Sequence, residues 1–424
     1  MMKSLRGGDA ARGCVAALIV ALAAIPSAGP GRTAEPIKIG FGMALTGGLA
    51  ANGKSALLAM KIWEEDTNAN GGLLERPVRL IYYDDQSNPA AVPGLFTKLL
   101  EVDKVDLVVG DYGTNLLAPA MPVVISHNMT FIGLFGLAVN SEFNYPKYFS
   151  TFPTGPDPKT GFSKGFFDVA MAQNPKPKTI AIAAADAEFA HNAADGARLN
   201  AKAAGLQIVY DRTYPPSTVD YAPIVRAIQA TNPDILYVGS YPLDSVGMVR
   251  AIKEVGLNVK LCCGGMVGLQ YTAFKTQLGS LLNGIVNYDV WLPVPTMMFP
   301  GIADFLKKYQ ERAVAEGVDP LGYYLPPFAY AQLQILGEAV QATKSLDQNK
   351  LADYIRDHTI KTVVGDLKFG KGGEWAEPRV LQIQFQHVKG NDVEQFKNPA
   401  TQVILSPKDY VSGKIIYPYA DAHE

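Results

Sequence analysis

Residues 106–135 read DLVVGDYGTNLLAPAMPVVISHNMTFIGLF, and this stretch decides the fold class. An apolar run at 106–111 predicts a buried strand. The segment from Leu116 to His127 has the length and apolar content of a helix, and 129–135 is a second apolar run. A strand, a helix and a strand in succession form a unit whose two strands lie parallel in one sheet.

The same alternation runs outward in both directions. Strand-like runs lie at 37–45, 78–85, 179–186, 206–214, 234–240, 259–263 and after 284, and helical segments lie at 55–70, 89–103, 192–204, 223–230 and 245–255. The alternation breaks at 151–158, TFPTGPDP, and then resumes, so we expect an α/β protein with two similar halves.

Three later helices, at 301–316, 327–343 and 350–357, have no strands of their own. We expect them to return and cover the sheet of the first half. A final strand pair follows, in GDLKFG and VLQIQFQHV. The chain would then pass between the two halves more than once.

The first 34 residues have the layout of a secretory signal. Three basic residues precede an apolar run of 11 residues at 15–25, VAALIVALAAI, and small residues follow it. Such a run is too short to span a bilayer, which takes about 20 residues. We expect cleavage between Ala28 and Ala34 and a protein that works in the periplasm. A buried N-terminal helix is the alternative.

Removal of residues 1–34 takes away four of 38 basic residues and one of 40 acidic residues, so the formal charge goes from −2 to −5. A mildly acidic chain without a basic run is not typical of a nucleic-acid-binding protein. The five histidines (127, 191, 358, 387 and 423) are scattered, and no paired-ligand spacing occurs. We therefore expect no nucleic acid, no metal and no cofactor.

Two adjacent cysteines, Cys262 and Cys263, remain after cleavage. A disulfide between neighbours departs from the usual geometry, in which the two Cα atoms are well apart. We expect two buried thiols at the end of a strand.

Residues 48–55, GLAANGKS, match the letters of a phosphate-binding P-loop. The apolar residues that follow require a helix already under way near Asn52, which makes Lys54 and Ser55 ordinary first-turn residues. An exported protein also meets little ATP. We therefore expect no nucleotide here, although a helix start after a glycine-containing loop suits a polar or anionic ligand group.

Several segments resemble the periplasmic leucine/isoleucine/valine-binding family, among them GMALTGGLAANGKS, YYDDQSNP, DLVVGDYGTNLLAPAMPVV and GYYLPPFAYAQLQILGEAV. The resemblance covers nearly all of the mature chain, in order. It implies the type I periplasmic-binding-protein fold, in which two Rossmann-like lobes are joined by a three-strand hinge and close on a ligand. Lobe 1 would hold 35–151 and 288–364, and lobe 2 would hold 152–287 and 365–424.

The resemblance also implies a function. The protein would be the monomeric solute-binding component of an ABC transporter of the branched-chain amino acid type, delivering a small solute to an inner-membrane permease. The alternative is a ligand-sensing protein of the same fold that partners a signalling receptor. An enzyme is less favoured, because His191 near Asp186, and Ser163, belong to no recognisable catalytic motif.

Site residues follow from the resemblance one at a time. In the family, a hydroxyl residue after the third strand holds the ligand carboxylate, and the matching residue in this chain is Thr114, with Asn115 beside it. In the family, an aromatic side chain of the second lobe covers the ligand, and the matching residue is Phe189. A tyrosine at the end of a strand matches as Tyr241. For both residues, packing in the hydrophobic core is the alternative. The full candidate set is Thr46, Thr114, Asn115, Phe135, Gly136, Leu137, Phe189, Tyr241 and Met266.

The chain departs from the family just after VKLCC. Amino-acid binders carry an acidic residue there, which pairs with the ligand ammonium, whereas this chain has Gly264, Gly265 and Met266. A buried ammonium without a counter-charge is costly. We therefore expect a small organic or aromatic carboxylate, or an amide, and amino acids remain an open alternative.

Overall fold

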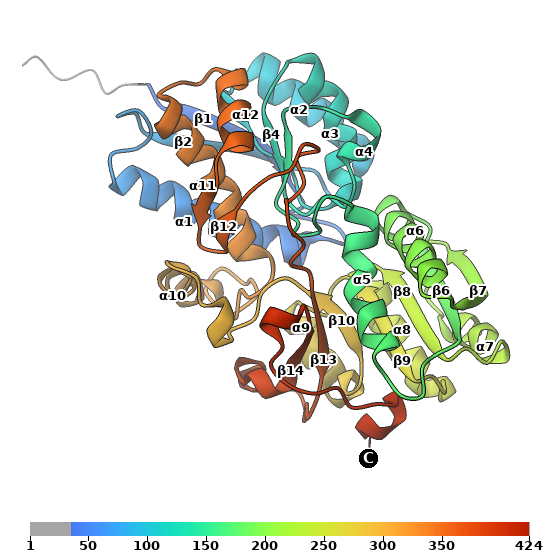
Figure 1. Ribbon diagram of the computed structural model, residues 1–424. Coiled ribbons are helices and arrows are strands. Elements are labelled where there is room, and N and C mark those ends of the chain that lie inside the picture. Colours follow the sequence, from blue (N-terminus) through green and yellow to red (C-terminus); the bar gives the residue numbers. More distant parts are fainter. Residues whose placement is uncertain (1–34, 424) are drawn as a thin grey trace, which may run out of the picture. The chain divides into compact units, whose positions relative to one another are not determined.

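The computed structural model describes residues 35–423, and the predicted signal at 1–34 lies outside the described residues (Figure 1). Residues 35–423 contain four β-sheets, of three, seven, two and two strands, and helices flank the two larger sheets. No helix within 35–423 combines the length and apolar character needed to cross a membrane.

The first sheet is built from the N-terminal strands. β1 (Ile37–Met43) lies between β2 (Val78–Asp84) and β3 (Leu107–Val108), and all pair in parallel. β4 (Phe131–Gly133) pairs in parallel with β5 (Tyr148–Ser150). A parallel bridge between Tyr112 and Leu134 continues the order from β3 to β4. The helices are α1 (Ala50–Ala69), α2 (Val92–Thr97), α3 (Thr114–Ser126) and α4 (Asn140–Phe143).

The second sheet has seven strands in the order β14-β13-β10-β9-β8-β6-β7. Its parallel part comprises β6 (Thr179–Ala185), β7 (Gln207–Tyr214), β8 (Ile235–Ser240), β9 (Leu261–Met266) and β10 (Val286–Asp289). β13 (Leu381–Phe385) and β14 (Gln402–Ser406) extend it with antiparallel pairing. Its helices are α5 (Pro158–Met171), α6 (Glu188–Ala203), α7 (Ala222–Ala230), α8 (Pro242–Val255) and α9 (Thr272–Leu278).

The later helices pack with one another and with α1 of the first sheet, and one of them also contacts β4. They are α10 (Ile302–Ala313), α11 (Leu325–Thr343) and α12 (Gln348–Asp357), and α11 packs along α1 (Figure 1). Gln332 on α11 donates to the backbone oxygens of Gly110, at 3.0 Å, and Ile132, at 2.6 Å. A short hairpin of β11 (Ile360–Thr362) and β12 (Gly365–Leu367) follows before the chain reaches β13. The exact lobe boundaries given above stay a prediction.

Six of the eight P-loop letters, residues 50–55, fall inside a helix. α1 begins at Ala50, five residues before the predicted start at Ser55. A Cβ on Gly53 would lie 2.0 Å from the backbone oxygen of Ala44, so the glycine lets α1 pack directly on the end of β1. The Ser55 hydroxyl donates to the Ala51 oxygen at 2.8 Å. Close packing therefore explains this glycine without a phosphate.

The prediction for the cysteine pair is half right. Cys262 and Cys263 are fully buried in β9, as expected. They are not thiols, however, because a disulfide joins them across a cis peptide bond. The prediction failed because it assumed the usual wide separation, whereas these Cα atoms are 3.3 Å apart.

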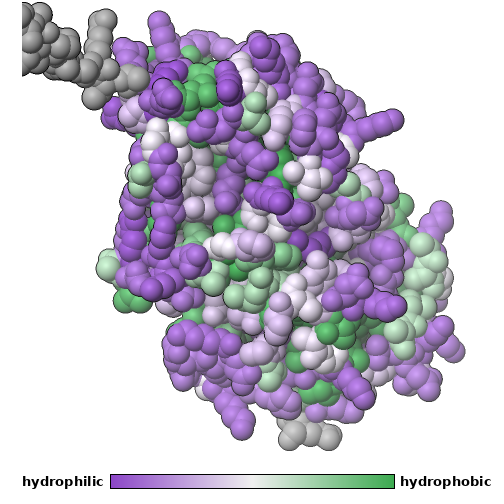
Figure 2. All heavy atoms as spheres, turned by 60° about the vertical axis from the view of Figure 1, so that its left-hand side comes forward, coloured by the Kyte–Doolittle hydropathy of each residue, from purple (hydrophilic) through white to green (hydrophobic). Residues whose placement is uncertain are grey.

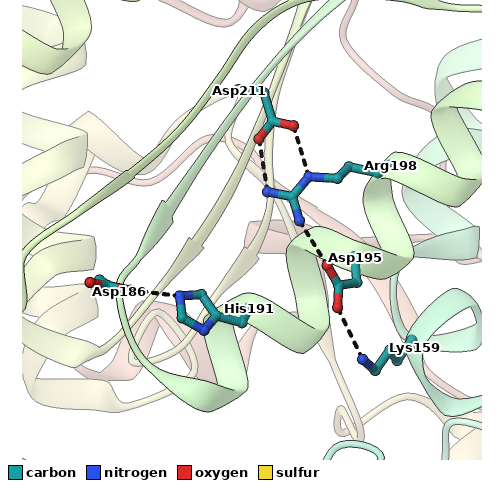
Figure 3. A network of polar contacts seen from close by, with 6 residues as sticks. All are labelled: Lys159, Asp186, His191, Asp195, Arg198 and Asp211. Carbon is teal, nitrogen blue, oxygen red and sulfur yellow. Dashed lines mark hydrogen bonds and ion pairs between the residues drawn. The ribbon is translucent and has the colours of Figure 1, made fainter.

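Charged side chains tie the helices of the second sheet together at the surface. Arg198 on α6 binds both carboxylate oxygens of Asp211 on β7 and also contacts Asp195, which in turn pairs with Lys159 on α5 (Figure 3). Hydrophilic side chains cover most of the face in Figure 2, with apolar side chains in smaller groups between them. Such exposed pairs add little stability individually.

Candidate functional site

The carboxyl ends of strands from both sheets line one cavity. In open α/β sheets, ligands bind outside these ends, at the point where the strand order reverses. That point lies between β1 and β3 in the first sheet and between β6 and β8 in the second. The cavity is lined by Leu49, Tyr112, Gly113, Thr114, Asn115, Phe135, Phe152, Phe189, Tyr241, Val267, Tyr288 and Tyr324.

The cavity is narrow and only partly enclosed. The space inside it is about 30 Å³, roughly enough for two water molecules. The side chains of the two sheets therefore lie close together around it.

The segment after β3 supplies polar groups from the first sheet. Gly113, with φ 91°, turns the chain into α3, whose first residues are Thr114 and Asn115. The Thr114 hydroxyl oxygen accepts the backbone N–H of Leu137 at 2.9 Å, which leaves its own hydrogen free to donate. A helix start also favours negative charge. This corner of the cavity therefore suits a carboxylate or an amide oxygen.

Aromatic rings form the walls. Phe135 stacks on Phe152 with ring centroids 4.8 Å apart, and Phe189 meets Tyr241 edge to face at 5.9 Å. Phe135 also contacts Phe328 of α11 at 4.9 Å. Flat, apolar walls of this kind favour an apolar or aromatic solute body.

Three tyrosine hydroxyls line another part of the cavity. The hydroxyl oxygens of Tyr288 and Tyr324 lie 2.8 Å apart, and Asn52 donates to the Tyr112 hydroxyl at 3.3 Å. Burial raises the pKa of Tyr112 to about 12, and it raises the pKa of Tyr324 well above its ordinary value. These groups are therefore neutral near pH 7, and a hydroxyl can both donate and accept a hydrogen bond.

None of the twelve lining residues carries a charge. Side chains at residues 264 and 265 would be sterically hindered. A Cβ on Gly264 would lie 2.7 Å from the Tyr237 ring, and a Cβ on Gly265 would lie 2.6 Å from the Tyr237 hydroxyl. Tyr237 is itself fully buried beneath them. An acidic side chain at either position would require this ring to move.

Comparison with known proteins agrees with this architecture. The family model described as periplasmic binding protein matches residues 36–383. The chain belongs to the periplasmic binding protein family. Among curated proteins, this binding protein is 24% identical to the Leu/Ile/Val-binding protein homolog 2 of Brucella abortus, over 88% of this chain and 96% of that one. It is 22% identical to the leucine-, isoleucine-, valine-, threonine- and alanine-binding protein of Pseudomonas aeruginosa, over 84% of this chain and 92% of that one.

Solved structures confirm the type I fold predicted for this binding protein. The substrate-binding protein LivJ of Streptococcus pneumoniae, in complex with isoleucine, superposes with a TM-score of 0.72 at 17% identity and covers 88% of this chain and all of that one. A solute-binding protein of Rhodopseudomonas palustris, in complex with 4-hydroxybenzoate, superposes with a TM-score of 0.71 at 18% identity. That match covers 84% of this chain and 95% of the other.

The structure brings five of the nine predicted site residues together in the binding protein's cavity: Thr114, Asn115, Phe135, Phe189 and Tyr241. Gly136 and Leu137 lie beside Phe135 but are not part of its lining, and Met266 lies buried next to Val267. Thr46 is exposed, and its hydroxyl donates to Asp84 at 2.7 Å, outside the cavity.

Seven lining residues were not predicted from the sequence: Leu49, Tyr112, Gly113, Phe152, Val267, Tyr288 and Tyr324. Tyr112 stands two residues before Thr114, so the same strand end could have revealed it. Tyr324 lies in GYYLPPF, a segment that carries the family resemblance. Tyr288 and Phe152 have no local signal, because the crossing of the chain between the sheets brings them to the cavity.

The residues considered for catalysis take part in two different polar contacts. His191 pairs with Asp186 at 2.8 Å, and both side chains are exposed (Figure 3). Ser163 is buried on α5, where its hydroxyl accepts from Asn200 at 2.9 Å. Among residues 35–423, no group of three or more histidine, cysteine or acidic side chains is arranged to hold a metal ion.

Proposed function

We propose that this protein captures a small organic acid with an apolar or aromatic body, or the corresponding amide, in the periplasm. It then delivers this solute to an ABC-type permease in the inner membrane. One observation carries the choice of solute: a cavity at the carboxyl ends of both sheets has aromatic walls, neutral hydroxyls and no charged side chain.

The polar groups favour an acceptor oxygen over a cation. Thr114 has a hydroxyl hydrogen to donate and lies at the start of α3, where negative charge is favoured. An ammonium would meet only neutral oxygens, since Tyr237 blocks the place where amino-acid binders carry an acid. The complex of the Rhodopseudomonas palustris protein with 4-hydroxybenzoate indicates that this fold can hold such a solute.

The mechanism follows from the two-sided lining. Thr114 and Phe135 come from the first sheet, and Phe189 and Tyr241 come from the second. A solute that contacts both sides binds the closed form better than the open form, and only this difference drives closure. The closed, loaded protein would then be the form that the permease accepts.

A thermal-shift screen followed by calorimetry tests the solute class. Benzoate, 4-hydroxybenzoate, benzamide and benzylamine share a ring and differ in charge and hydrogen bonding, and leucine represents the amino acids. We expect benzoate, 4-hydroxybenzoate or benzamide to raise the melting temperature, and benzylamine to leave it unchanged. Tight binding of leucine with no response to acids or amides would contradict the proposed solute. Chemical conversion of the bound molecule would contradict the transport role.

A further inference from the structure

Three tyrosines that line the cavity, Tyr112, Tyr288 and Tyr324, bring their hydroxyls together, and we call them the tyrosine cluster. The hydroxyl oxygens of Tyr288 and Tyr324 lie 2.8 Å apart, and the Tyr112 hydroxyl interacts with that of Tyr324. We propose that the tyrosine cluster binds a second, neutral polar group of the solute, such as a hydroxyl, at the end away from its carboxylate or amide. This inference rests on the proposed function, since it describes the same solute more closely.

The hydroxyls of Thr114 and Tyr112 are attached to opposite sides of β3. The Thr114 hydroxyl accepts the N–H of Leu137, in the loop that follows β4. The Tyr112 hydroxyl accepts from Asn52 of α1, the helix that follows β1. β1 pairs with one side of β3, and the bridge between Tyr112 and Leu134 places β4 on the other side. A solute whose carboxylate binds Thr114 can therefore extend its far end towards the tyrosine cluster.

An apolar wall connects these two polar ends. Phe135 belongs to the same loop as Leu137, the partner of Thr114, and its ring lies 5.4 Å from the Tyr324 ring, edge to face. Phe152 stacks on Phe135, and its ring lies 6.1 Å from the Tyr288 ring. The stacked pair therefore runs from the Thr114 end to the tyrosine cluster. A solute body packed on this wall would bring a polar group at its far end within reach of the hydroxyls.

The tyrosine cluster suits a hydroxyl better than a second charged group. Each tyrosine hydroxyl has one hydrogen to donate and can also accept. Among residues 35–423, the two contacts within the cluster use two of its three hydrogens, so one hydrogen remains for a solute oxygen. A second carboxylate would meet no cation, and an ammonium no anion, among the twelve lining residues. The solute should therefore carry no charge at this end.

Binding of matched ligands to the wild-type protein tests this inference. 4-Hydroxybenzoate and 4-methylbenzoate have nearly the same size and differ in hydrogen bonding at the far end, and terephthalate carries a second carboxylate there. 4-Hydroxybenzamide and 4-methylbenzamide make the same comparison for amides. We expect the hydroxylated member of a pair to bind about tenfold more tightly than the methylated one, as measured by isothermal titration calorimetry. Terephthalate should bind more weakly than 4-hydroxybenzoate.

Two variants locate the origin of this selectivity. Tyr324→Phe and Tyr112→Phe each remove one hydroxyl of the tyrosine cluster, and each should remove most of the difference between hydroxylated and methylated ligands. Tyr145→Phe is the matched control, because the buried Tyr145 hydroxyl donates to the Met129 oxygen at 2.7 Å and Tyr145 does not line the cavity. This control should lose a comparable hydrogen bond and keep the selectivity. Melting temperatures show that each variant is folded, and if Tyr324→Phe is not, Tyr112→Phe decides.

Failure of this inference and failure of the proposed function give different results. Equal affinities of the wild-type protein for the hydroxylated and the methylated ligands would overturn the inference and leave the proposed solute class in place. A preference for the hydroxylated ligands that persists in every folded variant of the tyrosine cluster would do the same. Binding of leucine with no response to any of these acids or amides would overturn the proposed solute, and the inference with it.

Discussion

The hydroxyl oxygens of Tyr288 and Tyr324 lie 2.8 Å apart, joining strand β10 of the second sheet to the start of α11, which packs on the first. Tyr288 is 1% exposed and Tyr324 is 4% exposed. Without Tyr324, the buried hydroxyl of Tyr288 would lose this hydrogen-bond partner. The part of the cavity wall formed by these two tyrosines therefore joins two segments whose contacting residues are 36 positions apart in the chain.

Replacement of Tyr324 by Phe should destabilise the protein. The change leaves the Tyr288 hydroxyl without this partner, at a cost of about 1–3 kcal/mol for a buried polar group. Urea denaturation would measure the loss in unfolding free energy. Tyr417→Phe is the control, since the Tyr417 hydroxyl bonds a backbone oxygen at the surface and its loss should cost less. Equal losses for the two variants would contradict the argument.

Replacement of Thr114 by Val should weaken binding of a carboxylate solute while keeping the side-chain shape. The lost hydrogen bond to a charged group is worth about 1.5–3 kcal/mol, which is roughly a tenfold to hundredfold rise in Kd. Thr114→Ser keeps the hydroxyl and should retain most of the affinity. Isothermal titration calorimetry with the tightest-binding acid from the thermal-shift screen would measure the change in Kd. An unchanged affinity in Thr114→Val would show that Thr114 does not contact the solute.

Gly53→Ala and Lys54→Ala separate the packing explanation of GLAANGKS from the nucleotide explanation. The new Cβ at position 53 would meet the Ala44 oxygen at 2.0 Å, so α1 must shift, and we expect a loss of roughly 1–3 kcal/mol in unfolding free energy. Lys54 is exposed, and its replacement should change stability by less than about 0.5 kcal/mol. A P-loop would give the opposite signature, namely ATP binding that disappears in Lys54→Ala.

The stability of the protein should fall as the pH rises, in part because of Glu374. This side chain is 5% exposed, and burial raises its pKa to about 8. The unfolded chain has a glutamate pKa of about 4.3, so between these values the folded state binds more protons than the unfolded state. Each pH unit in this window should therefore reduce the unfolding free energy by roughly 1.4 kcal/mol.

Glu374→Gln tests this window, because glutamine resembles the protonated acid and cannot ionise. The variant should be more stable than wild type at pH 8, and the difference should shrink towards pH 4–5. Glu377→Gln, at an exposed position in the same segment, is the control and should follow wild type at every pH. Parallel curves for wild type and Glu374→Gln would show that Glu374 does not titrate in this range.

The fold was predictable because most strands are apolar runs and most helices are bounded by glycine or proline. β1, β2, β6 and β8 lie within the predicted runs. β5, at Tyr148–Ser150, was missed because three residues are too few to show a period. The apolar pattern placed the helix at 55–70, with its start near Asn52, whereas α1 begins at Ala50, where Gly53 lets the helix pack closely on Ala44.

The candidate site was predictable only in part, for a reason of topology. Thr114, Asn115, Phe189 and Tyr241 directly follow strand ends that a sequence can reveal. Whether Asn115 contacts a solute or the opposite sheet depends on the distances between segments that are far apart in the chain. A local sequence pattern does not predict these distances. The block by Tyr237 beneath Gly264 is likewise a contact between neighbouring strands, visible only after their register is known.

The seven-stranded sheet takes two of its strands, β13 and β14, from residues 381–406. β10 has β13 as its neighbour on one side, so its outer edge stays open until those residues arrive. An open strand edge is a hazard for aggregation. A nascent chain therefore carries this exposed edge from the completion of β10 at Asp289 until β13 begins at Leu381, and a holding chaperone would be of most use to it in that interval.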